Sequence, residues 1–151
     1  MWTRQHKQRN TGRLIIPSLC AAFLAYFGFH AYHGEFGIKG GPFWNGTAIR
    51  AGVGETQLWT ITNNAVWAHP IHLHGFFFQV VDENGAPVHP IAWKDTISVP
   101  ADKTVRVLVR FDRPGSWMFH CHILDHAEAG LMSTVDVGDN LPEHIHRHTG
   151  P

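Results

Sequence analysis

Four metal-binding side chains fall within the seven residues 120–126, His-Cys-His-Ile-Leu-Asp-His, of this 151-residue chain. The segment 115–119 leads into them and predicts a strand, in which successive side chains point to opposite faces. Cys121 then points one way, while His120 and His122 point the other way. One short segment can therefore hold two metal sites, one on each side, joined by the backbone of Cys121.

A second histidine-rich segment, His-Pro-Ile-His-Leu-His, lies upstream at residues 69–74. If this backbone is extended, His72 and His74 share one face and His69 falls on the other. The two segments together then give two donor sets. The thiolate set is Cys121, His69 and His126, and the imidazole set is His72, His74, His120 and His122. The thiolate set suits a trigonal copper used for electron transfer, whereas the imidazole set suits copper that binds oxygen.

Two other interpretations of these side chains are structural core histidines and a zinc site. Seven donors in two clusters with matched alternation are hard to explain as separate structural histidines. Zinc sites pair two cysteines closely or carry four ligands at one point. Only one cysteine, Cys121, lies near the histidines, while Cys20 lies in an apolar run, so the two do not predict a disulfide framework.

The two segments resemble the C-terminal copper motifs of the multicopper oxidases, the family of laccases, bilirubin oxidases and cuprous oxidases. The resemblance extends to Trp-Lys-Asp-Thr at 93–96 and Pro-Gly-Ser-Trp-Met-Phe at 114–119, and it covers about residues 43–138. It implies an all-β, cupredoxin-like domain. By the same resemblance, the type 1 copper ligands are His69, Cys121 and His126, the type 2 ligand is His72, and the type 3 ligands are His74, His120 and His122.

The axial position of the type 1 copper in this family falls ten residues after the cysteine, at Leu131. A leucine cannot coordinate, and losing an axial methionine generally raises the reduction potential. The neighbouring Met132 would bring a sulfur to the copper if the chain shifted by one residue.

The resemblance also implies a reaction. Electrons from a reducing substrate would pass through Cys121 and its neighbours His120 and His122, the expected catalytic residues, to a trinuclear cluster that reduces dioxygen to water. A complete cluster in this family uses eight histidines, and this chain offers four. We therefore expect a second cupredoxin domain or chain as a partner. The alternative is a membrane-tethered carrier or store of a single copper without oxidase activity. A third possibility is a division-related membrane protein with an inactive cupredoxin.

Residues 43–138 carry a β pattern. In the segment 103–111 the apolar residues Val105, Val107, Val109 and Phe111 are expected to point inward, with Arg106 and Arg110 outward. Asn84-Gly85 is a hairpin turn signal. Six or seven short strands of this kind predict a Greek-key sandwich. The family has a further strand or two before the counterpart of Phe43, and the sequence pattern does not reveal them.

Residues 1–36 predict a basic cytoplasmic stretch and one N-terminal membrane helix. The run 14–29 is apolar except for Ser18 and follows a stretch with four basic and no acidic residues. This orientation predicts a bacterial inner-membrane protein whose cupredoxin domain, after a glycine-rich linker at 37–42, lies on the periplasmic or extracellular side. Because a span usually needs about 20 residues, a cleaved signal peptide and a buried helix remain alternatives.

Three further features complete the sequence. Residues 25–37 resemble the N-terminal membrane segment of bacterial septum formation initiator proteins, but no coiled-coil heptads follow. The tail 139–151 carries histidines at 144, 146 and 148, which predict either a further metal site or a solvated polar tail. The formal charge is zero overall, and from residue 34 onward 8 basic and 12 acidic side chains leave −4, so we expect no nucleic-acid partner.

Overall fold

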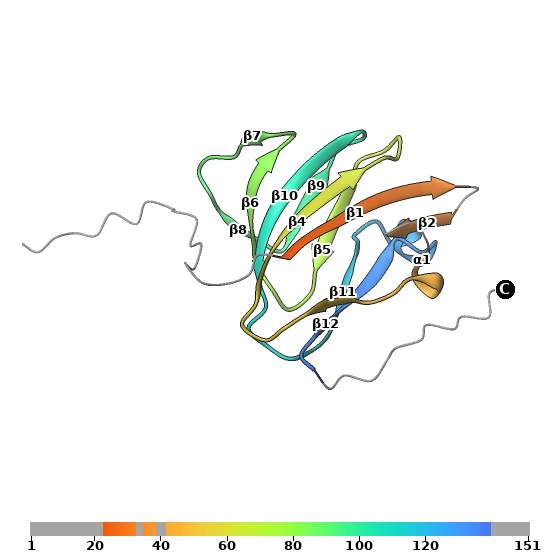
Figure 1. Ribbon diagram of the computed structural model, residues 1–151. Helices are drawn as coiled ribbons and strands as arrows, with labels where there is room; N and C mark the ends of the chain where they lie inside the picture. The colour runs from red at the N-terminus through yellow and green to blue at the C-terminus, as the bar shows by residue number, and fades with distance from the viewer. Residues whose placement is uncertain (1–22, 33–34, 39–41, 140–151) are drawn as a thin grey trace, which may run out of the picture.

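The computed structural model describes residues 23–32, 35–38 and 42–139. These residues form two β-sheets that enclose one core (Figure 1). The first sheet contains β1 (Phe23–Tyr32), β2 (Glu35–Ile38), β4 (Thr56–Asn63), β6 (Phe78–Glu83), β7 (Ala86–Pro87), β8 (Trp93–Lys94) and β10 (Lys103–Arg110). The second sheet contains β3 (Ile49–Ala51), β5 (His69–Leu73), β9 (Thr96–Val99), β11 (Gly115–Cys121) and β12 (Met132–Val137). Two short helices, η1 (Phe43–Asn45) and α1 (Leu124–Glu128), lie between strands.

The strand order places the histidine segments side by side. The first sheet runs β2-β1-β4-β10-β6-β7, with β8 also on β6, and the second runs β3-β12-β11-β5-β9. The expected all-β fold is therefore confirmed. The alternating side chains of β10 give it a buried face and a more exposed face. Val105, Val107 and Val109 are fully buried, while Arg110 is exposed.

Aromatic side chains fill the core between the sheets. The ring of Trp59 on β4 lies 5.7 Å from that of Phe111 and 5.2 Å, edge-on, from that of Phe119 on β11. The indole N–H of Trp59 donates a 2.7 Å hydrogen bond to Gln57 Oε1, so this polar atom is satisfied inside the core. Its contact with Trp59 holds Phe119, and with it β11, against the first sheet. Phe119 lies two residues before Cys121.

The described part of the N-terminal segment is a strand, where the sequence predicted a membrane helix. Residues 23–32, which include the second half of the apolar run 14–29, form strand β1 and pair in parallel with β4, with Phe23 opposite Gln57 (Figure 1). Within the described ranges, no helix has the length and apolar character that a membrane span needs. A short apolar run rich in aromatic residues fits a buried strand as well as a helix, and periodicity alone does not separate the two.

β1 and β2 also supply the strands that the sequence pattern did not reveal before Phe43. β2 pairs antiparallel with β1 and ends at Ile38, so the sheet includes the first two residues of the predicted linker 37–42. The basic stretch 1–13, Cys20 and the tail histidines at 144, 146 and 148 lie outside the described residues.

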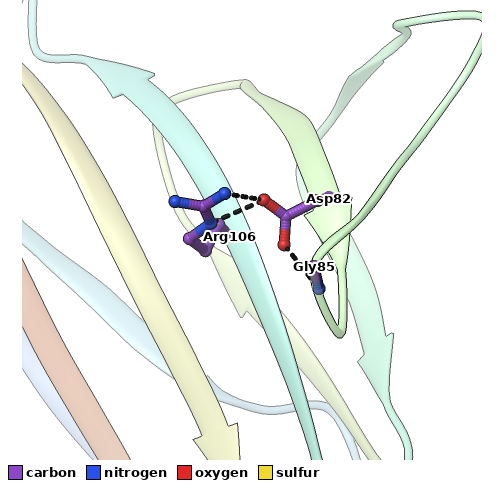
Figure 2. Close-up of polar contacts among 3 residues, drawn as sticks. All are labelled: Asp82, Gly85 and Arg106. Atoms are coloured by element: carbon purple, nitrogen blue, oxygen red, sulfur yellow. Dashed lines mark hydrogen bonds and ion pairs between the residues drawn. The ribbon is translucent and has the colours of Figure 1, made fainter.

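A buried carboxylate joins the hairpin of β6 and β7 to β10 (Figure 2). Asp82, only 3% exposed, accepts a 2.5 Å hydrogen bond from Arg106 Nε and forms an ion pair with the same guanidinium. Its other oxygen accepts a 3.2 Å hydrogen bond from the Gly85 N–H. Asn84 and Gly85 have φ of 51° and 78°, the conformation that the Asn-Gly turn requires. These contacts fix the register of β6 and β10 where it shifts between Arg106 and Val107.

Candidate metal centres

The neighbouring strands β5 and β11 carry most of the predicted metal ligands. They pair antiparallel, with His120 opposite His72 and Cys121 opposite Ile71. Cys121 is fully buried on the core side, whereas His122 is exposed. The strand geometry therefore separates the two donor sets onto the two sides of the second sheet, as the alternation predicts.

The thiolate set converges on one point. Cys121 Sγ lies 3.6 Å from His69 Nδ1 and 3.9 Å from His126 Nδ1, and the two nitrogens are 3.2 Å apart. In the part of the chain that the structure describes, this is the one group of three or more His, Cys, Asp or Glu donors within 4.8 Å of one another. A point equidistant from three atoms at these separations lies about 2.1 Å from each, close to a metal–ligand bond length. The donor set therefore fits a metal ion of trigonal preference.

Short-range backbone hydrogen bonds hold the thiolate set in place. The Cys121 N–H donates to the Leu131 carbonyl at 2.9 Å, and the Leu131 N–H donates to the His126 carbonyl at 2.9 Å. His126 lies on α1, whose first turn is closed by a 3.1 Å hydrogen bond from its N–H to the Ile123 carbonyl. His69 begins β5 and pairs with Val99 on β9. Three separate elements thus bring their donors together.

Leu131, at the expected axial position, is fully buried in the same apolar cluster as Cys121. Met132 pairs with His120 across β11 and β12, so its side chain lies on the outer face of the second sheet, the side away from the core. The structure therefore does not have the one-residue shift that would bring the Met132 sulfur toward Cys121.

Burial sets the charge of the thiolate set. Burial, together with a smaller effect of the nearby His126, lowers the pKa of His69 to about 4. Burial also raises the pKa of the Cys121 thiol, against a smaller opposing effect of a backbone hydrogen bond at Ile123. Without metal, both groups are therefore neutral at pH 7. A metal that binds here must displace the thiol proton.

The imidazole set gathers on the outer face of the second sheet. Five of its six pairs of rings have centroids between 4.7 Å (His72 and His74) and 5.9 Å (His120 and His122) apart. The closest nitrogens are Nε2 of His74 and Nε2 of His120, 2.9 Å apart. His74 and His122 are exposed, and among the described residues these four histidines form no closed three-donor group. The face is therefore an open arrangement of donors.

Hydrogen bonds select the nitrogen that each of two imidazoles offers to a metal. His72 Nδ1 lies 3.0 Å from the Asp95 carbonyl oxygen and 2.9 Å from Thr96 Oγ1. A carbonyl oxygen only accepts, so His72 Nδ1 carries the proton and Nε2 keeps its lone pair. The Thr96 hydroxyl donates to Asp95 Oδ1 at 3.0 Å, which leaves it as an acceptor for His72. His120 is held the same way, because its Nδ1 lies 2.8 Å from the Cys121 carbonyl oxygen.

The two donor sets therefore present different nitrogens. The thiolate set turns Nδ1 toward the sulfur, and His72 and His120 turn Nε2 outward. Burial lowers the pKa of His74 and of His120, and the neighbouring histidines lower both further. For His120, the hydrogen bond to the Cys121 carbonyl opposes this shift. Neutral imidazoles are the form that binds metal.

Comparison with known proteins gives the family. The sequence profile described as multicopper oxidase matches residues 26–140. The chain is 32% identical over 102 residues to the multicopper oxidase MmcO of Mycobacterium tuberculosis, covering 68% of this chain and 20% of that protein. It is 39% identical over 84 residues to copper resistance protein A of Escherichia coli, covering 56% of this chain and 13% of that protein. The crystal structure of a multicopper oxidase from Pediococcus acidilactici superposes with a TM-score of 0.74 and 32% identity, over 85% of this chain and 30% of that one. The chain belongs to the multicopper oxidase family.

The match covers only a part of these relatives, since the chain spans about a fifth or less of the two curated proteins. It is a domain of the multicopper oxidase type, and membership of this family implies copper as its cofactor. The profile begins at residue 26, inside the segment 25–37 whose sequence had suggested a septum formation initiator segment. The structure forms β1 and β2 from this segment, so it is part of the oxidase-type fold.

Residues that the sequence did not identify support the thiolate set. Trp67 lies over the His126 ring, with centroids 6.2 Å apart and planes 25° apart. Asn63, fully buried, donates to the carbonyls of Trp67 at 2.7 Å and Val99 at 2.9 Å, and accepts from the Ala65 N–H at 2.9 Å. The only sequence signal for Trp67 is its place two residues before His69.

Proposed function

We propose that this chain is the type 1 copper domain of a multicopper oxidase and contributes half of the trinuclear cluster. The type 1 ligands are His69, Cys121 and His126, with Leu131 as a non-coordinating axial neighbour. The type 2 ligand is His72, and the type 3 ligands are His74, His120 and His122. The observation that carries this proposal is the junction on β11, where a buried thiol on the core side is flanked by two imidazoles on the outer face.

The chain's own atoms form the connection between the two centres. Copper bound at each centre would supply the one-electron chemistry. The peptide bonds on either side of Cys121 lead to His120 and His122, and the 2.8 Å hydrogen bond from His120 Nδ1 to the Cys121 carbonyl adds a shorter route. Water is excluded from the Cys121 end of this path, since neither Cys121 nor His69 has exposed surface.

The open outer face supports the need for a partner. His74 and His120 have their Nε2 atoms 2.9 Å apart, a separation that suits a shared metal, but no third His, Cys, Asp or Glu of the described residues closes the group. By resemblance to the family, a second cupredoxin domain or chain would supply four further histidines. Dioxygen would then bind between the two halves, and a reducing substrate would give its electrons at the type 1 centre.

We also propose that the domain works on the exported side of a bacterial inner membrane. With β1 beginning at Phe23, the apolar residues before the described sheet are 14–22, which follow the basic stretch 1–13. This nine-residue stretch, apolar except for Ser18, fits the core of a signal peptide, about 7–15 residues long, better than a span of about 20. An uncleaved membrane tether is the alternative. Cell fractionation followed by N-terminal sequencing of the mature chain separates the two.

A second candidate function is a single-copper electron carrier. The observation in its favour is that the thiolate set alone forms a closed donor group in the described part of the chain. Oxygen uptake by the purified, copper-saturated chain with a one-electron donor tests both functions. We expect no steady four-electron turnover from the chain alone and turnover once the partner domain is added. If the partner domain does not give rise to oxygen uptake, the result supports the electron-carrier function instead.

The same experiment also needs a variant without the tail histidines at 144, 146 and 148. A deletion ending at Gly138 removes them and retains every described donor. Turnover by the intact chain, lost in the deletion, would show that these histidines complete the cluster and that no partner domain is needed.

A further inference from the structure

Two methionines share the outer face with the imidazole set. Met132 on β12 pairs with His120 on β11. On the other side of β11, Phe119 pairs with Leu73 and the His74 N–H donates a 2.9 Å hydrogen bond to the Met118 carbonyl, so Met118 lies opposite His74. Directly opposite side chains of an antiparallel pair lie on the same face, with Cβ atoms about 4.5–5.5 Å apart.

These positions give each member of the closest imidazole pair a thioether neighbour. Met118 lies opposite His74 and two residues before His120 on the same strand, while Met132 lies opposite His120. Met118 is 40% exposed, whereas its neighbour Phe119 is buried in the core. The Met118 side chain therefore does not pack in the core. Its three rotatable bonds let the sulfur approach either imidazole.

The donors match a soft monovalent cation. Thioether sulfur selects Cu(I) over harder ions, and imidazole also binds copper. The Nε2 atoms of His74 and His120, 2.9 Å apart, already form a two-nitrogen site. All of these donors are neutral, so a monovalent ion leaves less uncompensated charge on this face than a divalent ion does.

We propose that Met118 joins His74 and His120 in a Cu(I) site on the outer face, with Met132 as a second thioether beside His120. Through this site, the chain binds Cu(I) on the imidazole set when no partner domain covers that face. It requires only the geometry of these side chains and not oxidase activity, so it stands or falls independently of the proposed function.

The test uses the full-length chain with Cys121→Ser, which removes the competing thiolate site. Ag(I), a diamagnetic stand-in for Cu(I), is titrated while the methionine methyl resonances are recorded. The chain has three methionines, and Met1 serves as the internal reference. We expect the Met118 resonance to shift at one equivalent, with a smaller shift for Met132. An unmoved Met118 resonance would overturn the proposal.

Affinity measurements separate a ligand from a merely structural residue. Met118→Leu conserves volume and removes the sulfur. It should weaken Cu(I) binding, measured anaerobically against a chromophoric chelator, by about tenfold or more. Zn(II), which prefers imidazole to thioether, should bind the variant within about twofold of the parent. Equal loss of Cu(I) and Zn(II) binding would mean that Met118 only shapes the histidine face, and the ligand assignment would be wrong.

Discussion

The side chains of Cys121 and His120 lie on opposite faces of one strand, yet His120 Nδ1 is hydrogen-bonded to the Cys121 carbonyl oxygen at 2.8 Å. The hydrogen bond fixes the His120 ring by the backbone of the residue that carries the thiol. A change in the conformation of Cys121 is therefore transmitted directly to the outer face. This coupling gives the two donor sets a common frame.

The first prediction concerns the turn after His74. Gly75 has φ of 76°, and a Cβ added there would lie 2.2 Å from Trp117 Cε3. Arg113 donates a hydrogen bond to the Gly75 carbonyl and lies 5.6 Å from the Trp117 ring centroid, which holds the turn against the indole. Gly75→Ala should lower the free energy of unfolding by about 2–5 kcal/mol, from left-handed strain of about 1–2 and overpacking of about 1–3.

Gly85→Ala is the matched control for this prediction. Gly85 has φ of 78° but nothing within 4 Å of an added Cβ, so it reports the backbone strain alone. Urea unfolding of the two variants should place Gly75→Ala clearly below Gly85→Ala. Equal stabilities would contradict the close contact with Trp117.

The second prediction concerns Thr96, which accepts a hydrogen bond from His72 and donates one to Asp95. Thr96→Val removes the hydroxyl and loosens the orientation of the His72 ring, although the Asp95 carbonyl remains. Metal affinity of the outer face should fall by about 10–100-fold, the usual effect of losing such a supporting hydrogen bond. Calorimetric titration with Zn(II) in a Cys121→Ser background measures it.

Ser98→Ala, an exposed position on the same strand, should leave this Zn(II) affinity unchanged. A Thr96→Val variant that binds Zn(II) as tightly as Ser98→Ala would show that the Asp95 carbonyl alone orients His72.

The third prediction is acid sensitivity of the copper-free chain. Burial lowers the pKa of His69 from 6.5 to about 4, so between these values the unfolded chain binds a proton that the folded chain does not. Stability from this group is therefore fully present above pH 6.5 and is lost as the pH falls toward 4. Urea midpoints measured from pH 7 to pH 4 should fall, and should fall less steeply in His69→Gln. An identical slope in the variant would assign the acid sensitivity to other groups.

Local geometry explains which parts of the site the sequence predicted. The separation of Cys121 from His120 follows from strand alternation, a property of adjacent residues. The all-β pattern of the region around Val105 is equally local. Strand β1 was missed because its pairing with β4 is a contact between distant segments, and the same apolar residues fit a helix.

The supporting contacts were missed for a similar reason. Trp67 contacts His126, and Gly75 lies against Trp117, only once folding brings these distant segments together. No spacing in the sequence encodes such contacts. The resemblance to a known family singled out the segment 93–96, but the role of Thr96 became visible only from its hydrogen bonds.

The absorption spectrum of the copper-loaded chain tests the central claim most directly. If Cys121 is a copper thiolate in a trigonal site with His69 and His126, the protein is intensely blue from sulfur-to-copper charge transfer. Cys121→Ser should abolish the band while the circular dichroism of the β-sheets is retained. Copper that binds the intact chain without such a band would contradict the type 1 assignment and, with it, the account of this domain as a part of a multicopper oxidase that transfers electrons.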